Sequence, residues 1–263
     1  MPMPLLFLIL QVLVLLGIAG KIGLTATIGS LILLTALYVK VNRRGPDGNY
    51  IQPDGEGFSW LREELEKLSR RAGIKTPKLL ILDEYIPNAF SYGHTVVLSM
   101  GLFEVLEEEE VLAVMAHEIG HIKNRDTLIF PLVVYGRYFS IGAVVLTFLL
   151  SSKLALGFLS LILYAFYEDS RAKFMKNREF KADETALHLL DVPMSMKRAL
   201  EELKYYEDLR SKVKMTGLPG IEPSIERPQR NTQLIETHPS YDERILRIIL
   251  EMENLKMQRG MLR

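Results

Sequence analysis

A long apolar stretch near the N-terminus limits what this chain can fold into. From Leu5 to Val39 the only charged side chain belongs to Lys21. A helix that crosses a bilayer needs about 20 apolar residues, so this stretch is too long for a single crossing. Gly20 and Lys21 lie near its middle, where a turn is favoured. We therefore predict that residues 1–42 form a transmembrane helical hairpin.

Two further apolar blocks, at residues 128–152 and 154–167, are separated near Lys153. They predict a second hydrophobic hairpin over residues 128–168, although its second block is short for a full crossing. Arg137 lies about 15 Å along the first block, where it either reaches back to the interface or belongs to the soluble part. The alternative for the whole region is a pair of buried helices in a soluble domain, because short apolar runs occur in both settings.

Positive charges beside the apolar blocks predict how the chain is oriented. They gather at one set of helix ends, while the opposite ends carry only Lys21 and Lys153. The gathered residues are Lys40, Arg43, Arg44, Lys123, Arg125, Arg171, Lys173, Lys176 and Arg178. Since cytoplasmic flanks carry the excess of Lys and Arg, we expect a multi-pass protein of the cell membrane with its N-terminus and polar part in the cytoplasm.

The composition excludes several kinds of partner and site. Lysine and arginine number 32, as do aspartate and glutamate, so nothing indicates the basic surface that a nucleic-acid partner requires. The chain contains no cysteine, which excludes disulfides and thiolate metal sites. A zinc ion would therefore need histidine and carboxylate ligands, and the chain has five histidines.

His117, Glu118 and His121 form a His-Glu-x-x-His motif within residues 107–126, which we predict to be helical. Side chains four apart on a helix share a face, so both imidazoles can bind one zinc ion. Glu118 can then accept a proton from a water molecule on the metal. The alternative is a charged helix face that carries two unrelated histidines.

Zinc at a catalytic site needs a third protein ligand and an open position for water. Glu179 follows His121 by 58 residues and shares one face of another predicted helix with Asp183. We predict Glu179 as the third ligand, and Asp183 as the acceptor of the remaining N–H of a ligand imidazole. The alternative for Glu179 is a solvated carboxylate in a charged stretch.

The remaining histidines and one arginine complete the set of candidate residues. His238 and Arg244 are candidate donors to the oxyanion that forms during hydrolysis. Alternatively both are structural, with His238 capping a helix that begins near Pro239 and Arg244 in a salt bridge. His94 and His188 are not predicted to be ligands.

Three short apolar runs, at residues 78–82, 88–92 and 94–99, predict a small antiparallel sheet ahead of the motif helix. Gly93 favours a turn between the last two runs. Such a sheet can offer an edge to an extended peptide, and the backbone ladder binds a peptide whatever its side chains. The sequence therefore predicts loose selectivity toward a peptide substrate.

Four pieces of the chain occur in a fixed order: Pro87–Phe90, Ala116–Asp126, Arg178–Asp183, and Thr237–Pro239 with Arg244. Hydrophobic segments separate the second piece from the third. Together these pieces resemble the HtpX heat-shock proteases, membrane-bound zinc peptidases related to the CAAX prenyl endopeptidases. The resemblance extends from the first hairpin to about residue 248.

The resemblance implies a zinc metalloendopeptidase with one zinc ion per chain, held by His117, His121 and Glu179, and with Glu118 as the catalytic residue. It implies a role in stress response and quality control, in which misfolded or damaged membrane proteins are degraded at the cytoplasmic face.

The resemblance also places Asn88 and Ala89 on the strand that faces the substrate. Ser91-Tyr92-Gly93 departs from the family, which more often has Ala-Thr-Gly there, and this departure bears on the shape of the substrate pocket.

The fold that we expect is a mainly α integral membrane protein with a catalytic domain of the α+β gluzincin type. The two hairpins, residues 1–42 and 128–168, alternate with the two parts of the catalytic domain, residues 43–127 and 169–263. Two other functions are considered: a prenyl-protein endopeptidase of the CAAX type, and a membrane scaffold with a vestigial zinc site. Unfolded or membrane proteins and the lipid bilayer are the expected partners.

Overall fold

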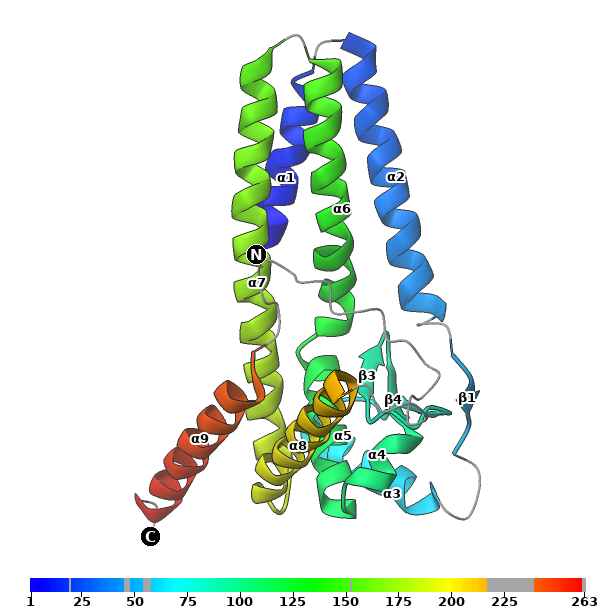
Figure 1. Cartoon of the computed structure of the whole chain (residues 1–263), viewed down its shortest axis with the longest axis vertical. Coiled ribbons are helices and arrows are strands. Elements are labelled where there is room, and N and C mark those ends of the chain that lie inside the picture. The colour runs from blue at the N-terminus through cyan, green and yellow to red at the C-terminus, as the bar shows by residue number, and fades with distance from the viewer. Residues whose placement is uncertain (19, 45–47, 54–57, 152, 217–238, 262–263) are drawn as a thin grey trace. The chain divides into compact units, whose positions relative to one another are not determined.

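The computed structural model of the chain describes residues 1–18, 20–44, 48–53, 58–151, 153–216 and 239–261. The chain divides into two compact units. The first unit comprises residues 1–47 and 125–178, and the second comprises residues 48–124 and 179–263. In Figure 1 the described part of the first unit consists of long helices, and the second unit contains the small sheet.

The first unit contains α1 (Met3–Leu16), α2 (Gly20–Arg44), α6 (Asp126–Leu150) and the first part of α7 (Leu154–Leu189). Two of these helices are joined by a buried polar pair. The amide of Gln11 on α1 donates to the carbonyl of Ser160 on α7 over 2.8 Å, and the Ser160 hydroxyl donates back over 2.8 Å. Because both side chains are buried and bond to each other, this pair helps to fix how the two helices align.

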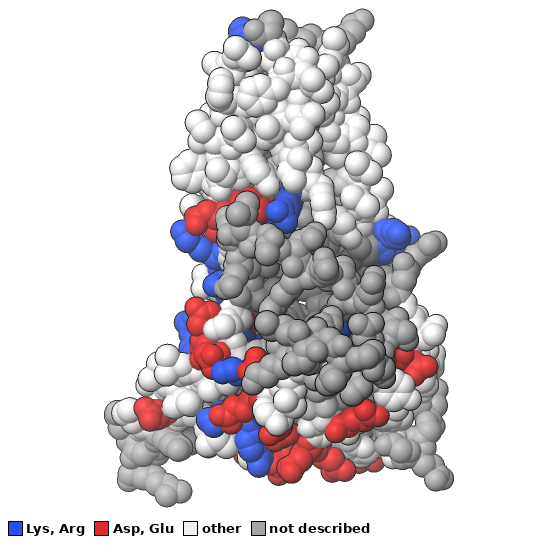
Figure 2. All heavy atoms as spheres, viewed as in Figure 1, with Lys and Arg blue, Asp and Glu red and all other residues white. Residues whose placement is uncertain are grey.

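Two helices of the described chain are long and apolar enough to cross a membrane, at residues 22–40 and 126–150. α1 is apolar but shorter. The fourth apolar block does not end a helix, since α7 continues through the charged residues that follow it to Leu189. Figure 2 shows that the uncharged surface of the first unit gives way to acidic and basic side chains at one end of its helices.

Several charged residues within the first unit form ion pairs. Arg137 lies 3.4 Å from Glu168, which is also bound by Arg171 over 2.8 Å. Asp126, at the start of α6, forms an ion pair with Arg178. Pairing reduces the cost of holding these charges among helices, and it explains how an apolar segment accommodates Arg137.

The second unit contains a four-stranded sheet of order β1-β2-β4-β3, formed by β1 (Tyr50–Ile51), β2 (Lys78–Leu82), β3 (Ala89–Tyr92) and β4 (Thr95–Ser99). The predicted antiparallel sheet is wrong, because β2 and β4 run parallel and the sheet is mixed. The reason is that β2 and β4 are nearly continuous apolar runs, which take central positions buried on both faces. β3 is only partly buried and lies at the edge.

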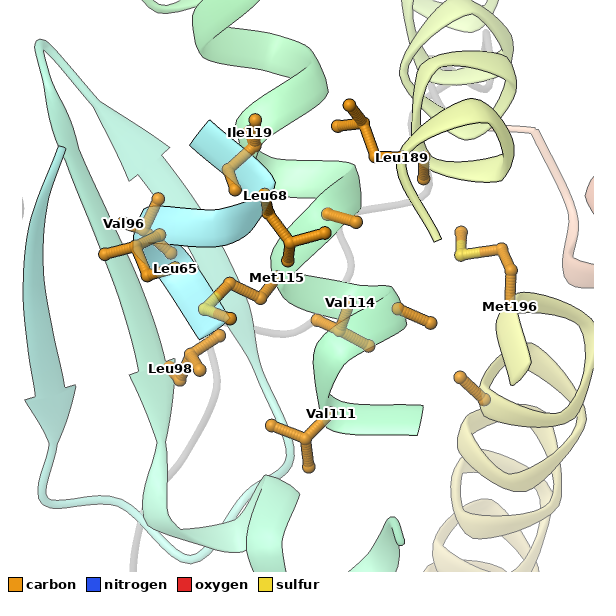
Figure 3. Close-up of a cluster of buried hydrophobic side chains, with 14 of the residues drawn as sticks. Leu65, Leu68, Val96, Leu98, Val111, Val114, Met115, Ile119, Leu189 and Met196 are labelled. Atoms are coloured by element: carbon orange, nitrogen blue, oxygen red, sulfur yellow. The ribbon is translucent and has the colours of Figure 1, made fainter. Parts of the chain in front are cut away.

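The second unit also contains the end of α7 and five further helices: α3 (Ser59–Ala72), α4 (Met100–Val105), α5 (Glu108–Lys123), α8 (Met194–Thr216) and α9 (Tyr241–Met261). α5 is the centre of the core, as Figure 3 shows. Met115 and Ile119 on α5 face the sheet and α3, where Leu65 and Leu98 pack against them. Met196 of α8 contributes to the same cluster. Burial of α5 between these layers fixes the helix that carries the metal-binding motif.

The two ends of α5 are set by local chemistry. Glu107 and Glu110 form a capping box, in which each carboxylate accepts a hydrogen bond from the other residue's backbone N–H. At the other end α5 stops at Lys123 with Asn124 as its C-cap, and Arg125, which follows, adopts a left-handed conformation with φ of 61°. The motif therefore lies in the last two turns of a helix with defined limits.

Candidate metal site

Residues His117, His121 and Glu179 converge in the second unit, and all three side chains are buried. The Nε2 atoms of the two histidines lie 3.1 Å apart. Glu179 on α7 places one carboxylate oxygen 3.5 Å from Nε2 of His117 and the other 3.6 Å from Nε2 of His121. The structure thus brings together the three ligands that the sequence predicts.

These distances fit a tetrahedral cation. Ligands about 2.0–2.1 Å from a tetrahedral zinc ion lie about 3.3 Å from one another. The two Nε2 atoms lie 3.1 Å apart, and two different oxygens of Glu179 lie 3.5 and 3.6 Å from them, all close to that value. Two imidazoles and one carboxylate also leave the fourth position of such an ion for water or substrate. The donor set and its spacing therefore suit a bound metal ion.

A glycine allows the two ligand-bearing helices to approach closely. A Cβ atom at Gly120 would lie 2.9 Å from the carbonyl oxygen of Ala182 and 3.1 Å from its Cα. Both are backbone atoms, which cannot move aside as a flexible side chain can. Gly120 follows Glu118 by two residues and Ala182 follows Glu179 by three, so this contact sets the spacing of the site itself.

Asp183 and Arg244 support His117 on the side of the ring away from Nε2. Oδ1 of Asp183 lies 2.7 Å from Nδ1 of His117. Arg244 on α9 donates two hydrogen bonds to Asp183, over 2.9 and 2.6 Å, and one of its terminal nitrogens lies 3.3 Å from the same Nδ1. Asp183 thereby fixes the tautomer that leaves Nε2 available to a metal ion.

The charges of this group are strongly coupled. Burial opposes a positive charge on His117, but the Asp183 carboxylate outweighs it and raises the pKa of His117 to about 9. Burial likewise opposes ionisation of Asp183, yet Arg244 and His117 hold its pKa below the usual value. Arg244 is half-buried, and its pKa is raised, chiefly by Asp183. Without a metal ion, Asp183 is therefore an anion held between the cationic groups of His117 and Arg244.

The other candidate residues occupy several places. Glu118 is buried on α5 beside His117. Asn88 precedes β3. Its backbone N–H donates to the Ser99 hydroxyl over 2.8 Å, and its carbonyl accepts from the backbone N–H of Ser99 over 2.9 Å. Ala89 is the first residue of β3, which pairs antiparallel with β4. His238 lies outside the described residues.

His188 belongs to a second, different group of potential ligands. It lies with Glu184 and Glu251 so that one ligand atom of each is within 4.8 Å of the others. These side chains are exposed or half-buried, and Glu251 also accepts a hydrogen bond from Asn254 over 3.5 Å. The buried group at His117 is the one with the geometry of a metal centre.

The sequence reasoning did not assign roles to Gly120 and Ala182. Their contact depends on how α5 and α7 pack, and no local sequence pattern predicts that packing. The available signal was the small residue between the two histidines, since a small side chain on a helix allows a neighbouring backbone to approach.

Taken together, the helix-borne His-Glu-x-x-His motif and the carboxylate from a later helix define the metal-dependent hydrolases that use two histidines and a glutamate as ligands. A family model described as "Peptidase family M48" matches residues 56–250. This chain belongs to peptidase family M48. Two of its described helices are long and apolar enough to cross a membrane, and it is a membrane metalloendopeptidase.

Several curated relatives are similar over most of their length. The chain is 32% identical to a protease HtpX homolog of Dictyoglomus turgidum over 226 residues, which cover 78% of this chain and 74% of the relative. It is 31% identical to the protease HtpX of Stutzerimonas stutzeri over 227 residues, with 74% and 73% covered. The similarity confirms that the chain is an HtpX-like protease.

A solved structure shares the fold. The crystal structure of S. mikatae Ste24p superposes with a TM-score of 0.50 at 16% sequence identity. The match covers 92% of this chain and 61% of that one, so the present chain spans about three fifths of the solved protein. At this identity the likeness concerns the fold alone.

Proposed function

We propose that this protein is a zinc-dependent endopeptidase that cleaves unfolded or damaged membrane proteins at the cytoplasmic face. One zinc ion per chain would be held by His117, His121 and Glu179. The observation that carries the proposal is the approach of Glu179 to both Nε2 atoms across 58 residues of sequence. A bound zinc ion lowers the pKa of a water molecule from 15.7 to about 7 and polarises a carbonyl group.

Glu118 is the proposed general base. It follows His117 on the buried helix α5, so its carboxylate is held beside the site by the same backbone. It accepts a proton from the attacking water and then gives that proton to the leaving amine, which keeps the proton count balanced. Asp183 and Arg244 act on His117 alone, by holding its ring and its tautomer.

The edge strand β3 is the proposed substrate platform. It pairs with β4 on one side, and no other described strand pairs with it. An extended peptide can add to such an edge through backbone hydrogen bonds. These bonds do not depend on side-chain identity, which suits substrates defined by being unfolded.

The cytoplasmic location is proposed from the charges that flank the apolar segments. Arg43 near the end of α2 and the basic residues of α7 lie on the side that the positive-inside rule assigns to the cytoplasm. The four apolar blocks of the sequence would make the arrangement multi-pass. The proteolytic unit would then meet the cytoplasmic parts of membrane proteins.

Metal content and casein cleavage, measured in detergent, test the proposal. Glu118→Gln should keep one zinc ion per chain and lose cleavage, whereas His121→Ala should lose both. Glu108→Gln changes an exposed glutamate of the same helix and should leave both unchanged. Cleavage that survives Glu118→Gln, or that persists after chelation, would overturn the mechanism. Cleavage of a farnesylated peptide with no action on casein would favour the prenyl-protein endopeptidase.

A further inference from the structure

One face of α2 is hollowed into an apolar groove of about 780 Å³. Ile28, Leu31, Ile32 and Val39 line it at the spacing of successive helical turns, and all four are exposed. The one hydroxyl among the lining residues, that of Thr35, donates to the carbonyl of Leu31 over 2.8 Å. The lining of this stretch therefore offers no unsatisfied hydroxyl, and it suits a hydrocarbon ligand.

Two cationic side chains, Lys40 and Arg43, line the C-terminal end of the same groove. They are three residues apart and so lie on one face of the helix. Within the described ranges, neither is paired with a carboxylate. An apolar groove that ends in two cations without a protein anion is complementary to a molecule with a hydrocarbon body and an anionic head.

The length of the groove limits which ligands fit it. From Ile28 to Val39 the helix rises about 16 Å, at 1.5 Å per residue. One leaflet of a bilayer contributes about 15 Å to the hydrocarbon core. An acyl chain lying along the groove would therefore place its headgroup beside Lys40 and Arg43.

We propose that the α2 groove binds an anionic phospholipid, with its acyl chain along Ile28–Val39 and its phosphate beside Lys40 and Arg43. This inference rests on the membrane orientation given under the proposed function. A transmembrane helix of a substrate fits less well. Such helices carry their own Lys and Arg at the cytoplasmic end, and these would meet Lys40 and Arg43 with like charge.

Spin-labelled lipids test the proposal directly. The full chain carrying Glu118→Gln, so that no proteolysis intervenes, is reconstituted in phosphatidylcholine vesicles with trace spin-labelled phosphatidylglycerol or spin-labelled phosphatidylcholine. The immobilised fraction of each label is measured by electron paramagnetic resonance. The unmodified groove should prefer phosphatidylglycerol by about five-fold for each of the two cations. Added inorganic phosphate should not displace the lipid, because it cannot use the apolar groove.

Two variants and one matched control decide the outcome. Lys40→Gln with Arg43→Gln should abolish the preference, and Ala36→Trp, which fills the groove but keeps both cations, should reduce it as well. Lys173→Gln with Lys176→Gln removes two cations from α7 and should leave the preference for phosphatidylglycerol unchanged. A preference for phosphatidylglycerol that is unchanged in either groove variant overturns the proposal. Zinc binding by the second unit is measured in parallel. It shows that each variant is folded, and it tests the proposed protease site independently of lipid binding.

Discussion

Oδ1 of Asp183 lies 2.7 Å from Nδ1 of His117, on the opposite edge of the imidazole from the atom that faces Glu179. Asp183 thus holds the His117 ring from the side away from the proposed metal position, so Nε2 of His117 stays available as a ligand. Asp183 and Glu179 are four apart on α7, so a single helical turn supplies both the proposed ligand and the group that orients another ligand.

Replacement of Asp183 by Asn should weaken zinc binding without unfolding the protein. The amide keeps the shape of the side chain but loses the charge that favours the correct tautomer of His117. Loss of such a partner costs about 10- to 100-fold in metal affinity. Competition with a chromophoric chelator measures the change. Asp191→Asn is the control, because this exposed carboxylate pairs with Arg71 away from the site and should have no effect.

Zinc affinity should fall as the pH is lowered through about 9. The pKa of His117 in the metal-free site is raised to about 9, so below that value a proton must leave before the imidazole can bind a cation. The affinity should therefore drop by about tenfold for each pH unit below 9 from this proton alone. Calorimetry in buffers of different ionisation enthalpy counts the protons released. Equal affinity at pH 7 and 9 would contradict the assignment.

The same shift affects the stability of the metal-free protein. A folded-state pKa above the unfolded value of about 6.5 means that protonated His117 stabilises the fold. This contribution is complete below pH 6.5 and is lost as the pH rises through 9. The melting temperature of the chelated protein should fall over that window, and the Asp183→Asn variant should show a smaller fall because the cation has lost its partner.

The site could be read from sequence to the extent that its geometry is local. The spacing of His117 and His121, and of Glu179 and Asp183, is a property of any helix, so the shared faces follow once the helices are predicted. The partnership of Arg244 with Asp183 crosses 61 residues. No periodicity in the sequence predicts this partnership. The sequence allows two roles for Arg244, as an oxyanion donor or as a member of a salt bridge. The structure has it bonded to Asp183.

The sheet shows where prediction from local pattern ends. The strands at residues 78–82 and 95–99 were recognised from their apolar runs, but their order depends on the path of the connection between them. β3 goes to the outside and β4 returns beside β2, so the neighbours are parallel. For the fourth apolar block the sequence allows either a shallow segment or a helix that extends into the following polar residues. The structure has the second, because α7 continues to Leu189.

Gly120→Ala should both destabilise the protein and weaken metal binding. The added Cβ would meet two backbone atoms of Ala182 at 2.9 and 3.1 Å, and the helices α5 and α7 must separate to relieve this. Overpacking of this kind costs about 1–3 kcal/mol, and separation moves Glu179 away from the histidines. Thermal unfolding and zinc titration measure the two effects. Gly142→Ala is the matched control, since its Cβ would meet nothing within 4 Å.

A peptide substrate whose backbone N–H groups are methylated one at a time should reveal whether β3 binds it as an added strand. Along an extended strand, alternate N–H groups point toward the same neighbour, so methylation should raise KM at every second position and not at the positions between. Loss of one backbone hydrogen bond should raise KM by about 2- to 10-fold. Steady-state kinetics on the methylated series measures the pattern. A uniform effect at all positions, or none at any, would mean that the substrate does not pair with this edge.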